Sequence, residues 1–222
     1  MTASLNGLPL VKASIQEPLL GVWFADVEVD SADDISGAIT MVVDGVAFSA
    51  SVYNPQGTQR GGIESGRWLA RIVGGAAGMQ TVLAAKNYAG VNIRAIVDDI
   101  LRDAGEALDA TNSLSAVLTT PVSRWHRMSA SAGTALRLLL DSIGSTFRMQ
   151  RDGTIYVGAQ SFAEVDETGI VVESTDPAIG LALAALNSPT ILPGVTFTGR
   201  PVSHVTTKVA PGSLRQEVWF SG

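Results

Sequence analysis

The sequence predicts an α+β protein, mainly β, in which a two-helix segment separates two sets of strands. Apolar and polar side chains alternate in residues 1–85, apolar side chains recur with helical spacing in residues 86–145, and alternation returns in residues 146–222. The chain of 222 residues is 46% hydrophobic and only 16% charged, so it can bury a core. We therefore expect two small barrel or sandwich domains at 1–85 and 146–222, with strand sharing between them left open, and a helical insert at 86–145.

The N-terminal region is predicted to be a meander of strands. The expected strands are Val22–Val29, Ile39–Val43, Val46–Tyr53 and Trp68–Val73. Asp44-Gly45 stands between the second and third of them and is a dipeptide typical of tight hairpin turns. Residues 54–66 are polar and rich in glycine, so we expect an exposed loop there.

The first helix is predicted to begin at Ile93, because apolar side chains recur there at intervals of three and four. These side chains are Ile93, Ile96, Val97, Ile100, Leu101 and Ala104. Asn92 is a suitable N-terminal cap, and Gly105 stands near the helix end. Asp98 and Asp99 are adjacent and are expected on the solvated polar face.

A second helix is expected at about residues 132–143, and the segment before it is expected to be loop-rich. Its apolar face comprises Leu136, Leu139, Leu140 and Ile143. Ser129 or Ser131 would cap its start, and Gly144 would end it. The preceding residues 109–128 contain Pro121 and Trp125 and show no regular spacing of apolar side chains.

The C-terminal region returns to the strand pattern. Residues 146–150 and 154–157 flank Arg151-Asp152-Gly153, which predicts a hairpin. Further strands are expected at 164–175, 195–198, 203–209 and 214–220, the last two joined across Pro211-Gly212.

The composition argues against several kinds of site. The chain has no cysteine, which excludes disulfides, thiolate metal sites and a cysteine nucleophile. His126 and His204 do not stand in a metal or triad pattern, so we expect no catalytic residue, no metal and no cofactor. The 15 Lys and Arg are scattered and the net charge is −6, so sequence-specific nucleic-acid binding is not expected. No apolar run reaches the ~18 residues of a membrane span, and no membrane partner is expected.

The glycine-rich stretch Gly74–Gly78 follows a predicted strand, as a phosphate-binding loop does. Glycines at such a place let backbone N–H groups approach an anion. The stretch lacks both the Gly-x-Gly-x-x-Gly spacing and the Gly-Lys-Ser/Thr ending of nucleotide loops. A tight connection between strands is therefore the favoured interpretation.

Two aromatic places are candidates for contacts with other chains. Trp125 and His126 lie in a polar and aromatic cluster, and Trp219 and Phe220 lie close to the C-terminus. An apolar terminus is either packed in its own sheet or held by another subunit, and both possibilities stay open. These four residues are the interface candidates.

Four stretches, taken in order, carry a family resemblance. Residues 21–30 read Gly-Val-Trp-Phe-Ala-Asp-Val-Glu-Val-Asp, and residues 83–88 lead into the helical repeat at 91–101. The second helix then runs into residues 144–158, and the run at 202–205 precedes Gly-Ser-Leu-Arg-Gln-Glu-Val-Trp at 212–219. In this order they resemble the tail or baseplate hub proteins of tailed bacteriophages.

The resemblance implies a structural, non-enzymatic virion protein made in the host cytoplasm. Hub subunits of this family carry two small β-barrel domains related to the tail-tube protein, and three chains form a ring that matches the six-fold tube. The implied partners are two further copies of the chain, the tail tube or a distal tail protein, the spike, and other baseplate proteins. DNA passes through the bore of the ring. Larger hubs carry peptidoglycan-cutting domains, for which this chain has no room.

Two other functions remain as alternatives. A carbohydrate-binding or adhesive β-domain of a phage tail tip would expose Trp125 and residues 54–66 on one surface. A small-ligand enzyme or binding protein would use Gly74–Gly78 and would be a monomer or dimer that binds a nucleotide.

Overall fold

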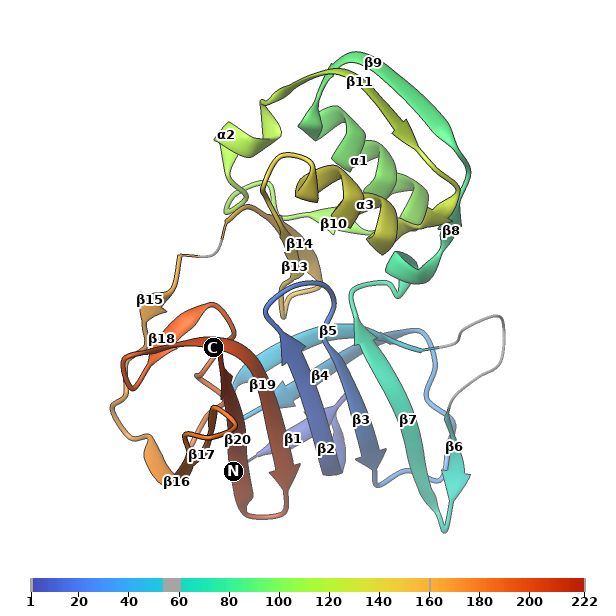
Figure 1. Cartoon of the computed structure of the whole chain (residues 1–222). Helices are drawn as coiled ribbons and strands as arrows, with labels where there is room; N and C mark the ends of the chain where they lie inside the picture. The colour runs from blue at the N-terminus through green and yellow to red at the C-terminus, as the bar shows by residue number, and fades with distance from the viewer. Residues whose placement is uncertain (1, 54–60, 160, 222) are drawn as a thin grey trace.

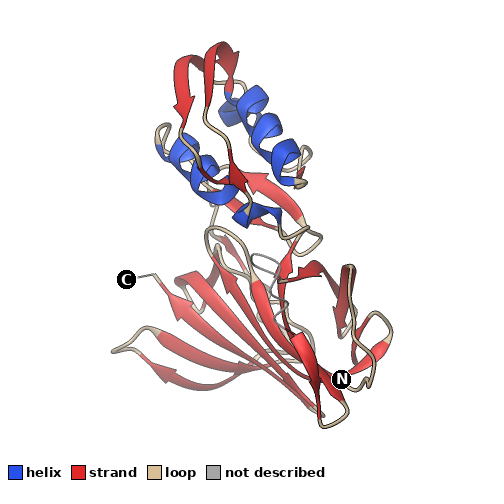
Figure 2. Ribbon diagram, turned by 90° about the vertical axis from the view of Figure 1, so that its right-hand side faces the viewer, coloured by secondary structure: helices blue, strands red, loops and turns tan. Residues whose placement is uncertain are grey.

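Two lobes make up the chain, a strand-rich body and a smaller helical lobe above it (Figure 1). The computed structural model describes residues 2–53, 61–159 and 161–221. Among the described residues, the body is built of strands, and α-helices lie in the other lobe, as Figure 2 shows. The predicted α+β, mainly β class is therefore confirmed.

Six strands of the body close into a barrel. They are β1 (Ala3–Leu5), β4 (Ala38–Val43), β5 (Val46–Val52), β7 (Arg67–Gly74), β3 (Phe24–Val29) and β2 (Leu8–Pro18), in that spatial order, and β1 pairs back onto β2. Closure depends on the length of β2. Its first residues Leu8 and Pro9 pair with β1, whereas Leu10–Gln16 pair with β3 on the other side.

The alternation in the sequence fills this barrel with apolar side chains. Phe48, Trp68 and Ile72 point inward and are fully buried. Trp68 also donates its indole N–H to Asp34 at 2.8 Å, which satisfies its polar atom. The predicted turn at Asp44-Gly45 is present, and both residues have positive φ, as a two-residue hairpin turn requires.

Four C-terminal strands extend the sheet from the far part of β2. They are β19 (Arg200–Ala210), β20 (Ser213–Phe220), β17 (Leu181–Ala185) and β16 (Val171–Asp176). β19 pairs with residues 13–18 of β2, so the two ends of the chain share one sheet. The short strand β18 (Val195–Phe197) pairs with β19, β15 (Ala163–Glu164) pairs with β18, and β6 (Gly61–Glu64) pairs with β7.

The helical lobe contains α1 (Ile93–Ala104) and α3 (Ala132–Asp141), both as predicted. Asn92 accepts a hydrogen bond from the Ala95 N–H at 2.9 Å, and Gly105 ends α1 in the left-handed conformation. Ser131 caps α3. The remaining elements are 3-10 helix η2 (Gly78–Gln80), β8 (Val82–Leu83), β10 (Ala107–Leu108), α2 (Ser115–Leu118), β12 (Ala130–Ser131) and the predicted hairpin β13 (Phe147–Met149) and β14 (Thr154–Val157).

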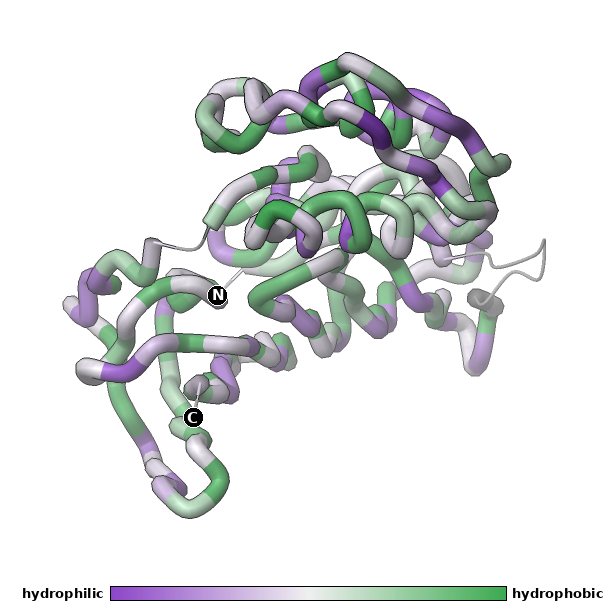
Figure 3. Tube along the Cα trace, turned by 45° about the horizontal axis from the view of Figure 1, so that its top comes forward, coloured by the Kyte–Doolittle hydropathy of each residue, from purple (hydrophilic) through white to green (hydrophobic). Residues whose placement is uncertain are grey.

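Two segments expected as loops contain strands. Residues 109–128 include β11 (Pro121–Arg127), which pairs with β9 (Lys86–Asn92) in a ribbon over α1. The ribbon is rich in polar residues (Figure 3), so it lacks the apolar alternation by which strands are recognised. Residues 61–64 of the other segment form β6, whereas residues 54–60 lie outside the described part of the chain.

The tip of the β13–β14 hairpin joins the two lobes. Arg151 donates two hydrogen bonds to the buried carboxylate of Glu17 on β2, at 2.7 and 2.6 Å. It also donates to the Pro189 carbonyl at 2.7 Å and lies over the Phe48 ring, 4.8 Å from its centre. One side chain thus links the helical lobe, the barrel and the loop before β18.

Candidate interface surfaces

In the part of the chain that the structure describes, one path of strands through the sheet ends in an open edge on each side. Eight strands follow one another in the order β6-β7-β3-β2-β19-β20-β17-β16, and every neighbouring pair is antiparallel. β6 pairs only with β7, and β16 pairs only with β17. Figure 1 places these two strands on opposite sides of the body. An open edge leaves backbone N–H and C=O groups available for pairing with another strand.

The β16 edge is exposed along its whole length and has apolar side chains at its start and in the turn that follows it. All six residues of β16 are exposed, and Val171 is 62% exposed. Ile179, in the turn that leads to β17, is 57% exposed. Natural edge strands are usually short, charged or covered, so the exposed side chains of Val171, Val172 and Ile179 make this edge a candidate for pairing with another strand.

The C-terminal candidates Trp219 and Phe220 lie on β20, one strand inward from β17. Both are half-buried. Trp219 is the register partner of Leu181, and Phe220 stacks on Phe197 with ring centres 6.5 Å apart. The guanidinium of Arg200 covers the Phe220 ring at 4.4 Å. Each aromatic side chain therefore packs within its own sheet and keeps part of its surface free.

The other candidates, Trp125 and His126, lie on β11 in the helical lobe, so the fold does not bring the two pairs together (Figure 1). Trp125 is half-buried and packs on Tyr88 with ring centres 5.6 Å apart. His126 is exposed and shares a hydrogen bond with Asn87 at 2.7 Å. The ribbon thus presents the imidazole outward and turns the indole toward its neighbouring strand.

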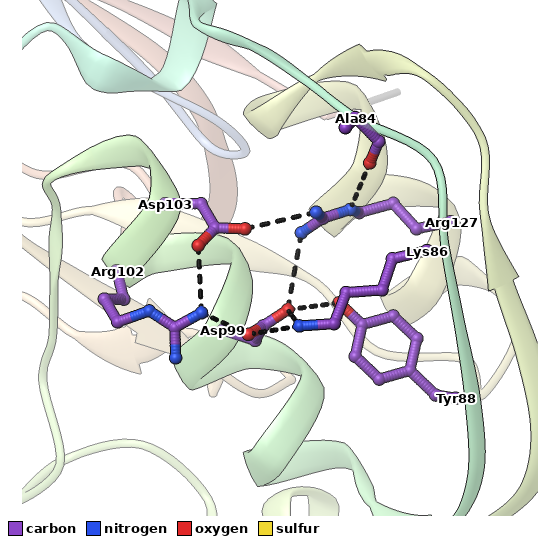
Figure 4. A network of polar contacts seen from close by, with 7 residues as sticks. All are labelled: Ala84, Lys86, Tyr88, Asp99, Arg102, Asp103 and Arg127. Carbon is purple, nitrogen blue, oxygen red and sulfur yellow. Dashed lines mark hydrogen bonds and ion pairs between the residues drawn. The ribbon is translucent and has the colours of Figure 1, made fainter.

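A polar network fastens this ribbon to α1 (Figure 4). The carboxylate of Asp99 accepts hydrogen bonds from Lys86 at 2.7 and 2.8 Å and from the Tyr88 hydroxyl at 2.5 Å. Arg102 also donates to it, and Arg127, only 3% exposed, lies 3.6 Å away. The expectation of a solvated Asp99 is therefore wrong. The ribbon covers this turn of the helix, which the sequence of the helix alone does not reveal.

These contacts shift two pKa values in opposite directions. Burial alone would raise the pKa of Asp99, but the surrounding ammonium, phenol and guanidinium groups outweigh it and hold that pKa far below its usual range. Burial and the bond to the carboxylate raise the pKa of Tyr88 well above its usual value. The raised pKa favours the protonated hydroxyl, which donates its hydrogen bond to the Asp99 carboxylate.

Replacing Asp99 with Asn is expected to lower the free energy of unfolding by about 2 kcal/mol at pH 7, because charge-assisted hydrogen bonds are lost. The depressed folded-state pKa means that the carboxylate stabilises the fold fully above its unfolded pKa and less as pH falls below about 4. The native chain and D99N should therefore differ less in free energy of unfolding at acidic pH than at pH 7, which urea unfolding at each pH measures. D98N is the matched control, because Asp98 on the same helix forms an exposed ion pair with Arg94. An equal decrease in the free energy of unfolding in D99N and D98N would contradict the prediction.

The glycine-rich stretch Gly74–Gly78 connects the two lobes, and its backbone N–H groups bind a carboxylate of the same chain. The Glu106 carboxylate accepts hydrogen bonds from the Ala76 N–H at 3.0 Å and the Gly78 N–H at 2.7 Å. The stretch leads from β7 through η2 to β8, so its role is a tight connection. The backbone N–H groups of Gly74–Gly78 thus bind the side chain that follows α1, in the way that a glycine-rich loop binds an anionic ligand.

No cluster of three or more potential metal ligands is found among the described residues. In the same part of the chain, none of the helices has the length and apolar character needed to cross a bilayer. The histidines lie in different lobes. His204 on β19 bonds to Gln16 at 2.7 Å, and burial lowers its pKa.

Comparison with known proteins finds no matching family model and no matching curated sequence. Solved structures do match. The 43 kDa tail protein of prophage MuSo2 from Shewanella oneidensis superimposes with a TM-score of 0.65 at 9% identity, covering 97% of this chain and 95% of that one. A tail protein from Neisseria meningitidis MC58 gives 0.63 at 14% identity, with coverages of 98% and 95%.

A third match comes from a secretion machine. The E. coli c3393 protein, a type VI secretion system component described as structurally similar to the T4 bacteriophage tail proteins gp27 and gp5, gives a TM-score of 0.63 at 13% identity. The match covers 100% of this chain and 77% of that one. At such identities the comparison establishes the fold, and at that level the predicted resemblance is confirmed: this chain has the fold of bacteriophage tail proteins.

Proposed function

We propose that the chain is a structural subunit of a phage tail, and that three copies form a hub ring through which DNA passes. The ring joins the tail tube to the spike and has no enzymatic activity. The observation that carries the proposal is the eight-strand path with an open edge at each end. The likeness to solved tail proteins over nearly the whole chain supports it.

Head-to-tail pairing of the two edges closes a ring. Seven antiparallel pairings separate β6 from β16, so the two strands run in opposite directions. In a ring with a rotation axis along the strands, β16 of one copy therefore meets β6 of the next in antiparallel orientation, and the sheet continues unbroken. Different edges meeting around an axis are the heterologous contact that builds rings.

The width of the path supports three copies. Neighbouring strands lie about 4.8 Å apart, so eight strands span about 38 Å and three copies give a circumference of about 115 Å. That corresponds to a diameter of about 37 Å at the strand backbones, which leaves room for a DNA duplex inside the side chains. Two copies give only about 24 Å before side chains are added, which is too narrow.

The four aromatic candidates divide between two contacts in this proposal. Trp219 and Phe220 lie near the β16 edge and support the contact between copies. Trp125 and His126 lie on the ribbon of the helical lobe, which stands away from the sheet edges (Figure 1) and serves tube, spike or other baseplate proteins.

The mass of the protein in solution tests the ring. Light scattering at several concentrations should give three times 23.1 kDa, and electron microscopy should then show a central hole. A chain that stays monomeric at every concentration, also after the tube protein is added, would overturn the proposal. A nucleotide-binding monomer or dimer would favour the small-ligand alternative instead.

A single charge at the β16 edge is expected to weaken the ring. Val171→Lys places an ammonium on the exposed apolar edge, and edge lysines are a device by which natural sheets prevent pairing. We expect the dissociation constant of the trimer to rise at least tenfold, measured by sedimentation. Val82→Lys is the matched control, because Val82 is 71% exposed but lies in the helical lobe. If V82K weakens the trimer as much as V171K, the β16 contact is wrong.

A further inference from the structure

A small cavity, here called the junction cavity, lies between the two lobes where the β13–β14 hairpin meets the body (Figure 1). Its volume is about 100 Å³, and its lining includes Arg148, Arg151, Glu17, Trp23 and Pro193. A single water molecule needs roughly 10–15 Å³ of such space, so the cavity has room for several waters or one small ion. Its lining contains no residue of β6 or β16, so it is separate from the edges of the proposed ring.

The charges around the junction cavity do not cancel. Arg151 donates to both oxygens of Glu17, at 2.7 and 2.6 Å, so these two side chains neutralise each other. Arg148 is the third charged residue of the lining. Two cations and one carboxylate leave one net positive charge, and that charge belongs to Arg148.

Arg148 uses little of its capacity to donate hydrogen bonds. It lies on β13 and is half-buried, and its Nη1 donates to the Pro193 carbonyl at 2.5 Å. Within the described ranges this is the one hydrogen bond of its side chain, and no carboxylate there forms an ion pair with it. A guanidinium carries five N–H donors in a rigid planar fork, so most of the donors of Arg148 remain available for a ligand.

A half-buried cation without a carboxylate is electrostatically unfavourable. Burial lowers the pKa of Arg148, and the more distant Glu17 carboxylate opposes that effect only in part. The helical lobe shows the usual arrangement, since the buried Arg127 donates to the Asp103 carboxylate at 3.1 Å. A buried charge is costly unless it is paired, so an anion that enters the junction cavity would gain from the unpaired guanidinium.

We propose that the junction cavity binds a small oxyanion and that Arg148 is its principal ligand. The chemistry is that of inorganic phosphate or of an acidic side chain from another chain, because both present a pair of oxygens to the guanidinium fork. The bound anion lies between β13 and the loop at Pro193, and it therefore stabilises the orientation of the two lobes. This inference goes beyond the proposed function and does not depend on the ring.

Isothermal titration calorimetry on the full chain tests the site, with inorganic phosphate and acetate as separate probes at constant ionic strength. For the anion that binds more tightly, we expect a dissociation constant on the order of 1 mM, the strength of a few charge-assisted hydrogen bonds. Arg148→Met should raise that constant at least about tenfold. A lower constant for phosphate identifies free phosphate as the ligand, and a lower constant for acetate identifies a side-chain carboxylate.

Two further variants separate the site from general effects of charge and folding. R124M is the matched control, because Arg124 is an exposed arginine on β11 and its loss changes the net charge equally. R124M should bind as the native chain does. R148K keeps the charge without the planar fork, so it should bind more weakly than the native chain even if R148M fails to fold.

Three results would overturn the inference. The first is a native chain that binds neither phosphate nor acetate. The second is an equal weakening of binding in R124M and R148M, because the anion would then respond to net charge rather than to the cavity. The third is unchanged binding in R148K. The mass of the protein in solution does not enter this test, so a failure of the ring and a failure of the anion site are distinguishable.

Discussion

Replacing Arg151 with Met is expected to lower the free energy of unfolding by about 3–5 kcal/mol, the cost of leaving a buried charge without its partner. Glu17 is only 5% exposed, and its carboxylate is held by the Arg151 guanidinium at 2.6 and 2.7 Å. The variant also loses the bond to the Pro189 carbonyl and the contact with the Phe48 ring. Urea unfolding followed by tryptophan fluorescence measures the loss.

Two further variants separate the ion pair from general packing. R67M removes an exposed arginine whose partner is Glu28, and it should cost less than about 1 kcal/mol. The double variant E17Q/R151M removes both charges and should recover part of the loss, because no unpaired ion remains. A loss in R151M no larger than that in R67M would show that this pair does not hold the lobes together.

Replacing Gly78 with Ala should be the most damaging single-methyl addition to the connection between the lobes. A Cβ at this position would lie 1.7 Å from the carbonyl oxygen of Ala104, in the last turn of α1. That neighbour is backbone, so it cannot turn aside as a side chain does, and either η2 or the end of the helix must move. We expect a loss of about 2–3 kcal/mol.

The midpoint of thermal unfolding should therefore fall by about 5–10 °C in a chain of this size. Gly62→Ala is the matched control, because no atom lies within 4 Å of the added Cβ and the backbone there is not in the left-handed region. G62A should be neutral or slightly stabilising, since alanine restricts the unfolded chain. A Gly78→Ala variant as stable as G62A would mean that the connection has room that the structure does not show.

The sheet that carries the proposed ring could not be assembled from the sequence alone. The strands themselves were predictable where alternation is clear, as in β3, β5 and β7. Their partners were not, because β2 pairs with β19 across about 190 residues of chain. Sequence pattern gives the face of a strand but not the distant strand beside it. The division into units at 1–85, 86–145 and 146–222 stays a prediction.

The interface candidates show the same limit. Aromatic residues near a terminus and in a polar cluster indicated contact surfaces, but the exposed β16 edge with Val171 and Ile179 was not among them. A strand was expected at 164–175, but its position at the edge of the sheet depends on which strands pair elsewhere in the chain.

The sequence by itself determined the local elements: α1 with its Asn92 cap and Gly105 end, the Asp44-Gly45 turn, and the β13–β14 hairpin. Each of these elements depends on side chains within a few residues of one another. The preferences of those residues for helix caps and tight turns are enough to predict it. Tertiary structure decided the rest: the burial of Asp99 under the ribbon, the carboxylate of Glu106 in the glycine stretch, and the two open edges. Those features depend on contacts between segments far apart in the chain, which form only when the hydrophobic core fixes the strand order.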